Sequence, residues 1–295
     1  SKESPDVIQG WMYHGNLAAF IINLFFRKKL TWNIRCSIQD LDSLKTTTRY
    51  LVYLSKYLSL WVDKIVFNSK LSMEQHEAIG FNKEKSLLIE NGFNIAKFKP
   101  YEGDEFDIKK SLDISTDAII FGHVARYHPI KNHIGFVDDF KSVISKYPNS
   151  YCIMIGRDVE PSNIELYEAI ERTGKAQHYF MLGECKNLVE FYSQFDFLIS
   201  SSLSEGFPNV LGEAMACGTP CIVSDAGDSR VVVGKYGFSY PVQDRGLFLN
   251  AIDQAYETTE TEYKALSKAC RKRIVDEFSI ESIYQKYSKY YMELF

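Results

Sequence analysis

Short apolar runs alternate with amphipathic runs from about residue 117 onward, and this alternation constrains the fold more than any other feature. Residues 118–124 and 151–155 have the length and composition of buried strands, and residues 132–147 between them place apolar side chains on one helical face. Strands that alternate with helices run parallel, so we predict an α/β fold with mostly parallel sheets covered on both sides. Further strands are expected at 178–182, 197–201 and 220–224, and further helices at 164–173, 188–193 and 210–217.

The first hundred residues show the same alternation. An Asn91-Gly92 turn and then Pro100 follow it, a composition typical of a linker. A chain of 295 residues with 45% apolar and 24% charged residues suits two domains, so we place a boundary near Pro100. Strands are expected at 6–8, 32–35, 64–67 and 86–89, and helices at 14–26, 45–60, 69–79 and 280–295.

Charge is spread unevenly along the chain. The net charge of −4 gives no general case for nucleic acid binding, but residues 1–99 carry 14 Lys and Arg against 9 Asp and Glu. This basic part could face an anionic membrane or a phosphate-linked acceptor, or it could be an ordinary solvated surface. Residues 17–26 are apolar except for Asn23 and precede Arg27-Lys28-Lys29, but the run is too short to span a bilayer. It is either a core helix with a basic end or a membrane-surface helix.

Six cysteines are scattered through the chain without a Cys-x-x-Cys pair. Scattered cysteines in strands and helices fit a reducing compartment, so we expect a cytoplasmic location. Cys217 and Cys221 flank Gly-Thr-Pro and are expected to pack at a helix-to-strand junction rather than to bind a metal.

Two glutamates, Glu205 and Glu213, enclose a Gly-Phe-Pro-Asn turn between the strand at 197–201 and the helix at 210–217. That helix is expected to end at Gly218, a usual C′ residue. Glu205 should therefore lie at the carboxyl end of a strand, in the crevice where open α/β sheets bind ligands. The turn amides lie at a helix N-terminus, which favours an anion such as phosphate. A helix-capping carboxylate beside an unrelated glutamate is the alternative interpretation.

This segment, with the Ala-Met-Ala-Cys-Gly-Thr-Pro that follows it, resembles the E-x7-E signature of the retaining GT-B glycosyltransferases of family 4. Residues 122–133 resemble the family's G-R-x-x-x-x-K-N/G loop, and residues 91–100 resemble its interdomain link. The resemblance implies two Rossmann-like domains with parallel sheets. The chain opens on a strand that resembles the middle of the family's first domain, so that domain is expected to be incomplete. The expected divisions are a partial acceptor-side domain at 1–99, a nucleotide-sugar-binding domain at 100–278 and a helix at 279–295 that crosses back.

The resemblance also implies donor contacts. Arg126 and Lys131 would bind the diphosphate, whose oxygens gain negative charge as the glycosidic bond breaks. Glu205 would contact a sugar hydroxyl, and Glu213 would hold the ribose hydroxyls, because a carboxylate can accept two hydrogen bonds from a vicinal diol. His123 has no assigned role. The turn and helix start that would approach the sugar and phosphate comprise Gly206, Phe207, Pro208, Asn209, Val210 and Leu211.

Residues 9–16 are expected to follow a strand and resemble the family's H-x-H-M-x-H-x-N pattern, although Gln9 and Trp11 stand where histidine is common. His14 matches the last histidine and is the expected acceptor-side polar group, which adds it to Glu205, Arg126 and Lys131 as catalytic candidates. A satisfied loop or core histidine is the alternative. One further candidate, Arg35, matches a recurring arginine that either faces the cleft or pairs with a carboxylate.

Asp40-Leu41-Asp42 has the D-x-D spacing with which a different glycosyltransferase fold binds a divalent cation. Here it precedes a helix, so capping is the preferred interpretation, and we expect neither a metal nor a cofactor. The sequence contains no G-x-G-x-x-G, which argues against a dinucleotide-binding dehydrogenase.

The resulting hypothesis is a retaining, metal-independent glycosyltransferase. It would move a hexose or N-acetylhexosamine from a nucleotide diphosphate sugar, expected to be UDP-linked, to a glycan or lipid-linked acceptor in surface polysaccharide synthesis. Peripheral contact with the inner membrane is a further expectation. The alternative hypothesis is a nucleotide-sugar-binding module without transfer activity.

Overall fold

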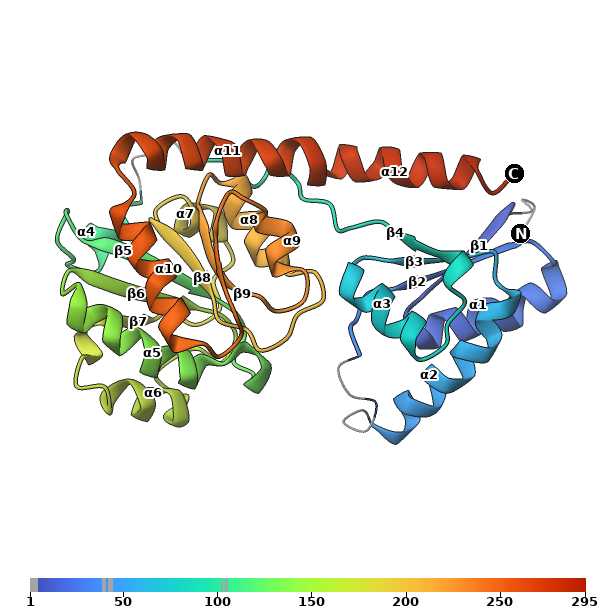
Figure 1. Ribbon diagram of the computed structural model, residues 1–295, viewed down its shortest axis with the longest axis horizontal. Coiled ribbons are helices and arrows are strands. Elements are labelled where there is room, and N and C mark those ends of the chain that lie inside the picture. Colours follow the sequence, from blue (N-terminus) through green and yellow to red (C-terminus); the bar gives the residue numbers. More distant parts are fainter. Residues whose placement is uncertain (1–4, 39–40, 42–44, 102, 104–105) are drawn as a thin grey trace. The chain divides into compact units, whose positions relative to one another are not determined.

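The computed structural model describes residues 5–38, 41, 45–101, 103 and 106–295. The chain divides into two compact units, one made of residues 1–92 and 281–295 and the other of residues 93–280 (Figure 1). The described part of each unit holds one sheet in which all strand pairs are parallel. The predicted α/β class with parallel sheets is confirmed.

The first unit has a sheet of order β1-β2-β3-β4. The last helix belongs to its core, because Ile283 and Tyr290 of that helix pack with Val66 and Ile89. The elements are β1 (Val7–Trp11), α1 (Met12–Phe26), β2 (Lys29–Ile34), α2 (Thr46–Leu58), β3 (Lys64–Phe67), α3 (Lys70–Ala78), β4 (Ser86–Leu88) and α12 (Ile280–Met292).

The prediction that residues 9–16 follow a strand is wrong for their first part. Residues 9–11 continue β1 and pair with residues 31–33 of β2, and α1 starts directly at Met12. Met12 adopts a left-handed φ of 60°, which turns the chain from strand into helix without an intervening loop.

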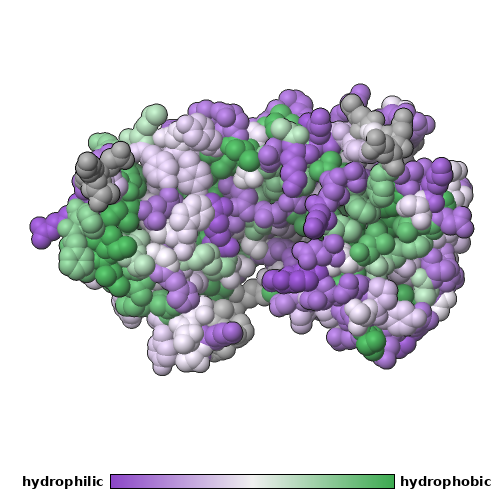
Figure 2. Space-filling model, turned by 180° about the vertical axis from the view of Figure 1, so that it is seen from behind, coloured by the Kyte–Doolittle hydropathy of each residue, from purple (hydrophilic) through white to green (hydrophobic). Residues whose placement is uncertain are grey.

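The apolar run of α1 is largely exposed. The side chains of Leu24, Phe25 and Phe26 are 62%, 81% and 56% accessible, and Trp61, which follows α2, is 65% accessible. Figure 2 shows apolar surface over this unit, at the left of the view. The run is therefore not an ordinary core helix. Across the described ranges, no helix combines the length and apolarity needed to cross a membrane.

The second unit has a sheet of order β10-β9-β8-β5-β6-β7. All elements predicted between residues 118 and 224 are confirmed to within two residues at each end. The elements are α4 (Ile108–Ser111), β5 (Ile119–Val124), α5 (His133–Lys146), β6 (Ser150–Ile155), α6 (Ile164–Glu171), β7 (Tyr179–Met181), α7 (Leu188–Tyr192), β8 (Phe197–Ser200), α8 (Asn209–Ala216), β9 (Cys221–Ser224), α9 (Ser229–Val233), β10 (Phe238–Tyr240), α10 (Arg245–Glu257) and α11 (Glu260–Phe278).

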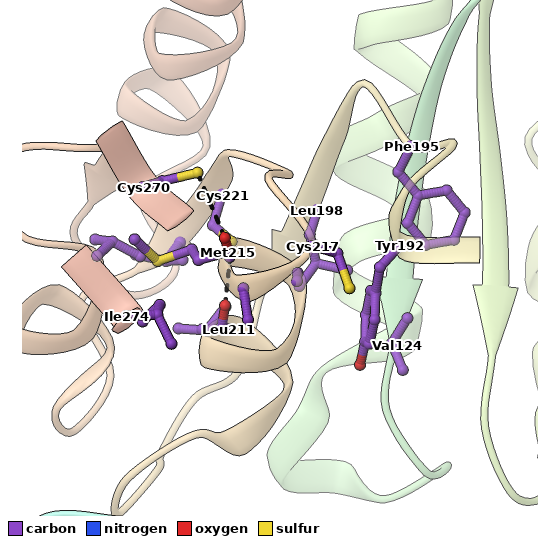
Figure 3. Packing of buried hydrophobic residues seen from close by; sticks show 14 of the residues in the cluster. Val124, Tyr192, Phe195, Leu198, Leu211, Met215, Cys217, Cys221, Cys270 and Ile274 are labelled. Carbon is purple, nitrogen blue, oxygen red and sulfur yellow. Dashed lines mark hydrogen bonds between the residues drawn. The ribbon is translucent and has the colours of Figure 1, made fainter. Parts of the chain in front are cut away.

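Both faces of this sheet are buried. Along β5, Ile120 and Val124 join one apolar cluster and Phe121 joins the other. Helices α5, α6 and α10 supply the cluster around Phe121, and α7, α8, α9 and α11 supply the opposite one. Figure 3 shows the latter, in which Met215 of α8 and Ile274 of α11 lie in the same buried layer.

The boundary between the two units lies between Gly92 and Phe93, a few residues before the boundary predicted near Pro100. The ring of Phe93 stacks on Phe207 with centroids 6.1 Å apart. It also lies where a side chain at Gly212 would be, 2.1 Å from an added Cβ. The start of the linking segment is therefore part of the second core, and position 212 must be glycine for this contact to form.

Candidate active site

The sheet of the second unit changes direction between β5 and β8. From β5 the chain continues to β6 on one side, and from β8 it continues to β9 on the other. The connections that leave the carboxyl ends of these neighbouring strands therefore lead to opposite sides, and such a point is where open α/β sheets bind ligands. The loop at 125–132 follows β5 and the loop at 201–208 follows β8.

The loop after β5 presents two cations. Arg126 is exposed, and Lys131 ends a short 3₁₀ turn, Pro129–Lys131. Asn132 then takes a left-handed φ of 56°, which asparagine tolerates better than most residues, and α5 begins at the next position. The turn thus places Lys131 directly ahead of a helix start at the crevice.

Lys131 and Glu205 meet at this crevice. Lys131 Nζ donates a hydrogen bond to Glu205 Oε1, and Ser202 Oγ donates to the same oxygen at 2.7 Å. The two charged side chains are 20% and 11% exposed, so the ion pair is largely withdrawn from water. The loop after β9 packs closely against the loop that carries Glu205, and glycine at position 227 permits this contact. A Cβ added there would lie 2.1 Å from the Glu205 carbonyl oxygen. The structure thus joins the predicted diphosphate lysine to the predicted sugar carboxylate.

The turn after Glu205 leads directly into α8. Gly206 faces open space, since an added Cβ would meet nothing within 4 Å. Phe207 is buried and Pro208 takes the N-cap position, so the helix starts at Asn209. The first amides of a helix have no partner within it, and Val210 and Leu211 follow in that first turn. The helix start thus lies after the carboxyl end of β8, as predicted, and anion binding by its amides stays a prediction.

Glu213 lies one turn further along α8. The Tyr192 hydroxyl donates to Glu213 Oε2 at 3.0 Å. Burial raises the pKa of Glu213, against the opposing effects of the Tyr192 hydrogen bond and the Lys97 charge. A carboxylate can accept about four hydrogen bonds, so the tyrosine orients Glu213 while using only part of its acceptor capacity.

The two candidates of the first unit differ in their surroundings. His14 is exposed in the first turn of α1, so it is not a core histidine. Arg35 follows β2 and donates to Asn33 Oδ1 and to the Tyr287 hydroxyl, both at 2.9 Å, and its guanidinium lies 4.7 Å from the Trp11 ring centroid. No carboxylate within the described ranges forms an ion pair with Arg35, so carboxylate pairing has no support there. Its contact with Tyr287 fastens α12 to the strand ends.

Several residues of the site escaped the sequence analysis. Ser202 holds Glu205 and Tyr192 holds Glu213. His123, which had no assigned role, is 1% exposed, and its Nε2 lies 3.1 Å from Ser201 Oγ. The run of serines at the end of a predicted strand was the one available signal, because hydroxyls at a strand terminus can orient neighbouring side chains.

The part of the chain that the structure describes contains no group of three His, Cys, Asp or Glu side chains able to hold a metal ion. Asp40 and Asp42, for which a capping role is predicted, lie outside that part. Cys217 is the C-cap of α8 and Cys221 begins β9, and both are buried, which confirms their packing at the helix-to-strand junction.

Comparison with known proteins places the second unit in a sequence family. The model of the family described as "Glycosyl transferases group 1" matches residues 104–273, which include both crevice loops and α8. The Escherichia coli UDP-Gal:alpha-D-GlcNAc-diphosphoundecaprenol alpha-1,3-galactosyltransferase is 29% identical over 215 residues, covering 71% of this chain and 54% of that protein. The Bacillus anthracis N-acetyl-alpha-D-glucosaminyl L-malate synthase is 24% identical over 226 residues, covering 75% and 57%. The chain thus spans about half the length of the curated relatives it matches.

Solved structures establish the fold independently. The crystal structure of Anabaena HepE in complex with UDP resembles this chain with a TM-score of 0.85 and 22% identity, over 98% of this chain and 79% of that one. At this level of identity the likeness concerns the fold alone. It confirms the predicted GT-B class of two Rossmann-like domains.

Proposed function

Because the chain belongs to the glycosyl transferases group 1 family, we propose that it transfers a sugar from a nucleotide diphosphate donor to an acceptor. The observation that carries this proposal is the contact between Lys131 and Glu205 at the switch point of the sheet. It supports the proposal because the cation that would bind the leaving diphosphate lies beside the carboxylate that would contact the sugar.

The leaving diphosphate is served by the loop after β5 and by the start of α8. Negative charge builds on the phosphate oxygens as the glycosidic bond breaks, and cations and amides already in position stabilise that charge most effectively. Lys131 is paired with Glu205, and Arg126 is exposed on the same loop. The amides of Val210 and Leu211 would complete the anion site.

The nucleoside and the sugar would lie on either side of the diphosphate. Glu213 would accept hydrogen bonds from the ribose hydroxyls, and Glu205 would contact a hydroxyl of a hexose or N-acetylhexosamine. A UDP-linked donor is supported by the E. coli relative, whose name specifies UDP-Gal, and by the UDP complex of HepE. The donor chemistry proposed here uses neither a metal nor a cofactor.

A retaining outcome is part of the proposal and rests on the signature formed by Glu205 and Glu213. In that mechanism the acceptor attacks on the face from which the diphosphate departs, and a phosphate oxygen takes the acceptor proton. Glu205 would stabilise positive charge on the reacting carbon. His14 would be a polar group on the acceptor side.

The acceptor is proposed to be a glycan or a lipid-linked sugar in surface polysaccharide synthesis. The E. coli relative acts, by its name, on a GlcNAc-diphosphoundecaprenol, so the lipid-linked class is supported by sequence similarity. A cytoplasmic location is supported by the six cysteines, all of which are free thiols.

Peripheral contact with an anionic membrane would use the exposed apolar residues of α1 and the segment after α2. Leu24 and Trp61 line a groove of about 380 Å³ on this surface, and Arg27, Lys28 and Lys29 follow α1 directly. Apolar side chains bordered by cations match an anionic bilayer surface in both hydropathy and charge.

Sedimentation with vesicles tests that contact. Leu24→Ser should reduce binding to phosphatidylcholine vesicles containing phosphatidylglycerol, whereas Ile164→Ser should not. Ile164 is the matched control, because both side chains are 62% exposed and it lies in the other unit. If the two variants bind the vesicles equally, or if the unaltered protein does not bind them, the proposed membrane contact is contradicted.

Transfer itself is tested by incubating the protein with radiolabelled UDP-glucose, UDP-galactose or UDP-N-acetylglucosamine and lipid-linked or free glycan acceptors. The proposal predicts label in an acceptor with at least one donor, and loss of transfer in Glu205→Gln. Tight donor binding without transfer to any acceptor would favour the alternative of a nucleotide-sugar-binding module.

A further inference from the structure

Two buried histidines lie behind the loop that carries Lys131. His123 is in β5 and His133 begins α5, and they are 1% and 2% exposed. Their ring centroids lie 4.8 Å apart, and the ring of His123 stacks on that of Phe136 with centroids 4.5 Å apart. At this depth neither imidazole can touch a donor in the crevice. Any role in the reaction must therefore pass through another residue.

A chain of hydrogen bonds connects His123 to Lys131. Ser201 Oγ donates to the Lys131 carbonyl oxygen at 3.3 Å and lies 3.1 Å from His123 Nε2. A serine hydroxyl has one proton to donate, so with that proton directed to the carbonyl the hydroxyl oxygen accepts from His123 Nε2 in the Nε2–H tautomer.

The environment keeps this imidazole neutral. Burial, together with the nearby His133 and the positive charge of Lys131, holds the pKa of His123 well below its usual range. His133 shares these surroundings, and its pKa is lowered to about 4, mainly by burial. A charged imidazole here would repel Lys131, whereas a neutral one can anchor the loop through its hydrogen bond without that repulsion.

We propose that His123 and Ser201 are positioning residues that hold Lys131 in place for the donor diphosphate, an inference that rests on the proposed function. A second hydrogen bond joins the same two loops, from the Leu203 amide to the Ile130 carbonyl oxygen at 2.8 Å. This bond and the one from Ser201 to Lys131 both connect the loop after β5 with the loop after β8. They fix the backbone of Lys131 relative to the loop that carries Glu205, and a cation already in position avoids reorganisation when the diphosphate binds.

Calorimetric binding of UDP and of uridine distinguishes positioning from general support of the fold. Ser201→Ala removes the link, and His123→Phe keeps a ring on Phe136 without a hydrogen bond. Each should weaken UDP binding about three- to ten-fold, as expected for one hydrogen bond, and leave uridine binding within about two-fold. His123→Gln, whose amide can reach the position of Nε2, should restore most of the UDP affinity. The double variant should be little worse than either single one, because both changes break the same chain.

Ser150→Ala is the matched control. Ser150 is also buried, and its hydroxyl donates to the Tyr147 carbonyl oxygen at 2.7 Å, but it lies at the amino end of β6. The Ser150→Ala variant should bind UDP as tightly as the unaltered protein does. Thermal unfolding of every variant shows whether the fold is kept.

Three outcomes would overturn the positioning role. They are UDP affinity unchanged in Ser201→Ala and His123→Phe, equal loss of UDP and uridine binding, and a His123→Gln variant no better than His123→Phe. The proposed function fails separately, if the unaltered protein binds UDP no more tightly than uridine or if Lys131→Ala binds UDP as well as the unaltered protein does.

Discussion

Lys131 and Glu205 form an ion pair although they lie in loops that leave two different strands, β5 and β8, in opposite directions. A bound diphosphate would share the Lys131 ammonium with Glu205, and a bound sugar would share the Glu205 carboxylate with Lys131. Because an ammonium has three N–H donors, Lys131 can contact the diphosphate without leaving its position.

Replacement of Lys131 by alanine should weaken UDP binding roughly ten- to hundred-fold, since hydrogen bonds to charged groups contribute about 1.5–3 kcal/mol. Uridine, which lacks phosphates, should bind as before. Titration calorimetry with both ligands measures the difference. Lys146→Ala, at the other end of α5, is the control and should bind both ligands normally. Equal weakening of UDP and uridine would contradict a phosphate contact.

Replacement of Glu205 by glutamine should separate binding from transfer. The variant loses the charge that would stabilise the reacting carbon, so transfer should fall about 100-fold, as when one electrostatic contact to a transition state is removed. UDP affinity should stay the same or rise, because Lys131 no longer has a competing carboxylate. Initial rates of transfer beside UDP binding constants test this. A UDP affinity that falls in parallel with the rate would show that Glu205 instead supports the fold of the site.

Replacement of Glu213 by alanine should weaken uridine and UDP by the same factor, about ten-fold, because both ligands present the ribose diol to this carboxylate. Tyr192→Phe removes only the hydroxyl that orients Glu213 and should produce a smaller loss in the same pattern. 2′-Deoxyuridine is the diagnostic ligand. The unaltered protein should bind it more weakly than uridine, and Glu213→Ala should not distinguish the two nucleosides.

Acid should destabilise the protein through its buried histidines. The pKa of His133 is about 4 in the folded protein, against about 6.5 when unfolded. Above pH 6.5 it is neutral in both states and contributes no pH dependence. Between pH 6.5 and 4 the unfolded state binds a proton that the folded state does not, so the free energy of unfolding falls by up to about 1.4 kcal/mol per pH unit.

Urea unfolding at pH 7 and pH 5 measures this effect. His133→Gln cannot titrate, so it should lose less stability over that interval than the unaltered protein does. An identical loss in both proteins would show that His133 does not contribute.

Most of the second unit follows from local sequence patterns. The apolar runs of β5, β6 and β8 are short, clearly bounded and separated by segments with helical periodicity. The motif that carries Lys131 and the motif that carries Glu205 are each a nearly continuous stretch of sequence. Their placement at one edge follows because the carboxyl ends of parallel strands share that edge. The elements predicted for residues 118–224 of this unit and the GT-B class are confirmed.

The failures involve contacts between distant residues. His123 and Ser201 are separated by 78 positions, and nothing in the sequence around either one signals the other. The prediction for residues 9–16 failed because the length of β1 is set by its pairing with β2, which local composition does not report. Phe93 was assigned to a linker because its packing against Gly212 depends on tertiary structure.

Calorimetric binding of UDP, GDP and ADP to the unaltered protein and to an Arg126→Ala/Lys131→Ala variant tests the proposed donor diphosphate site. We expect UDP to bind most tightly of the three and the double variant to lose this binding while it remains folded. If the folded protein binds none of the nucleotides, or if the double variant binds UDP as tightly as the unaltered protein, the proposal that the β5 and β8 loops form a donor diphosphate site is contradicted.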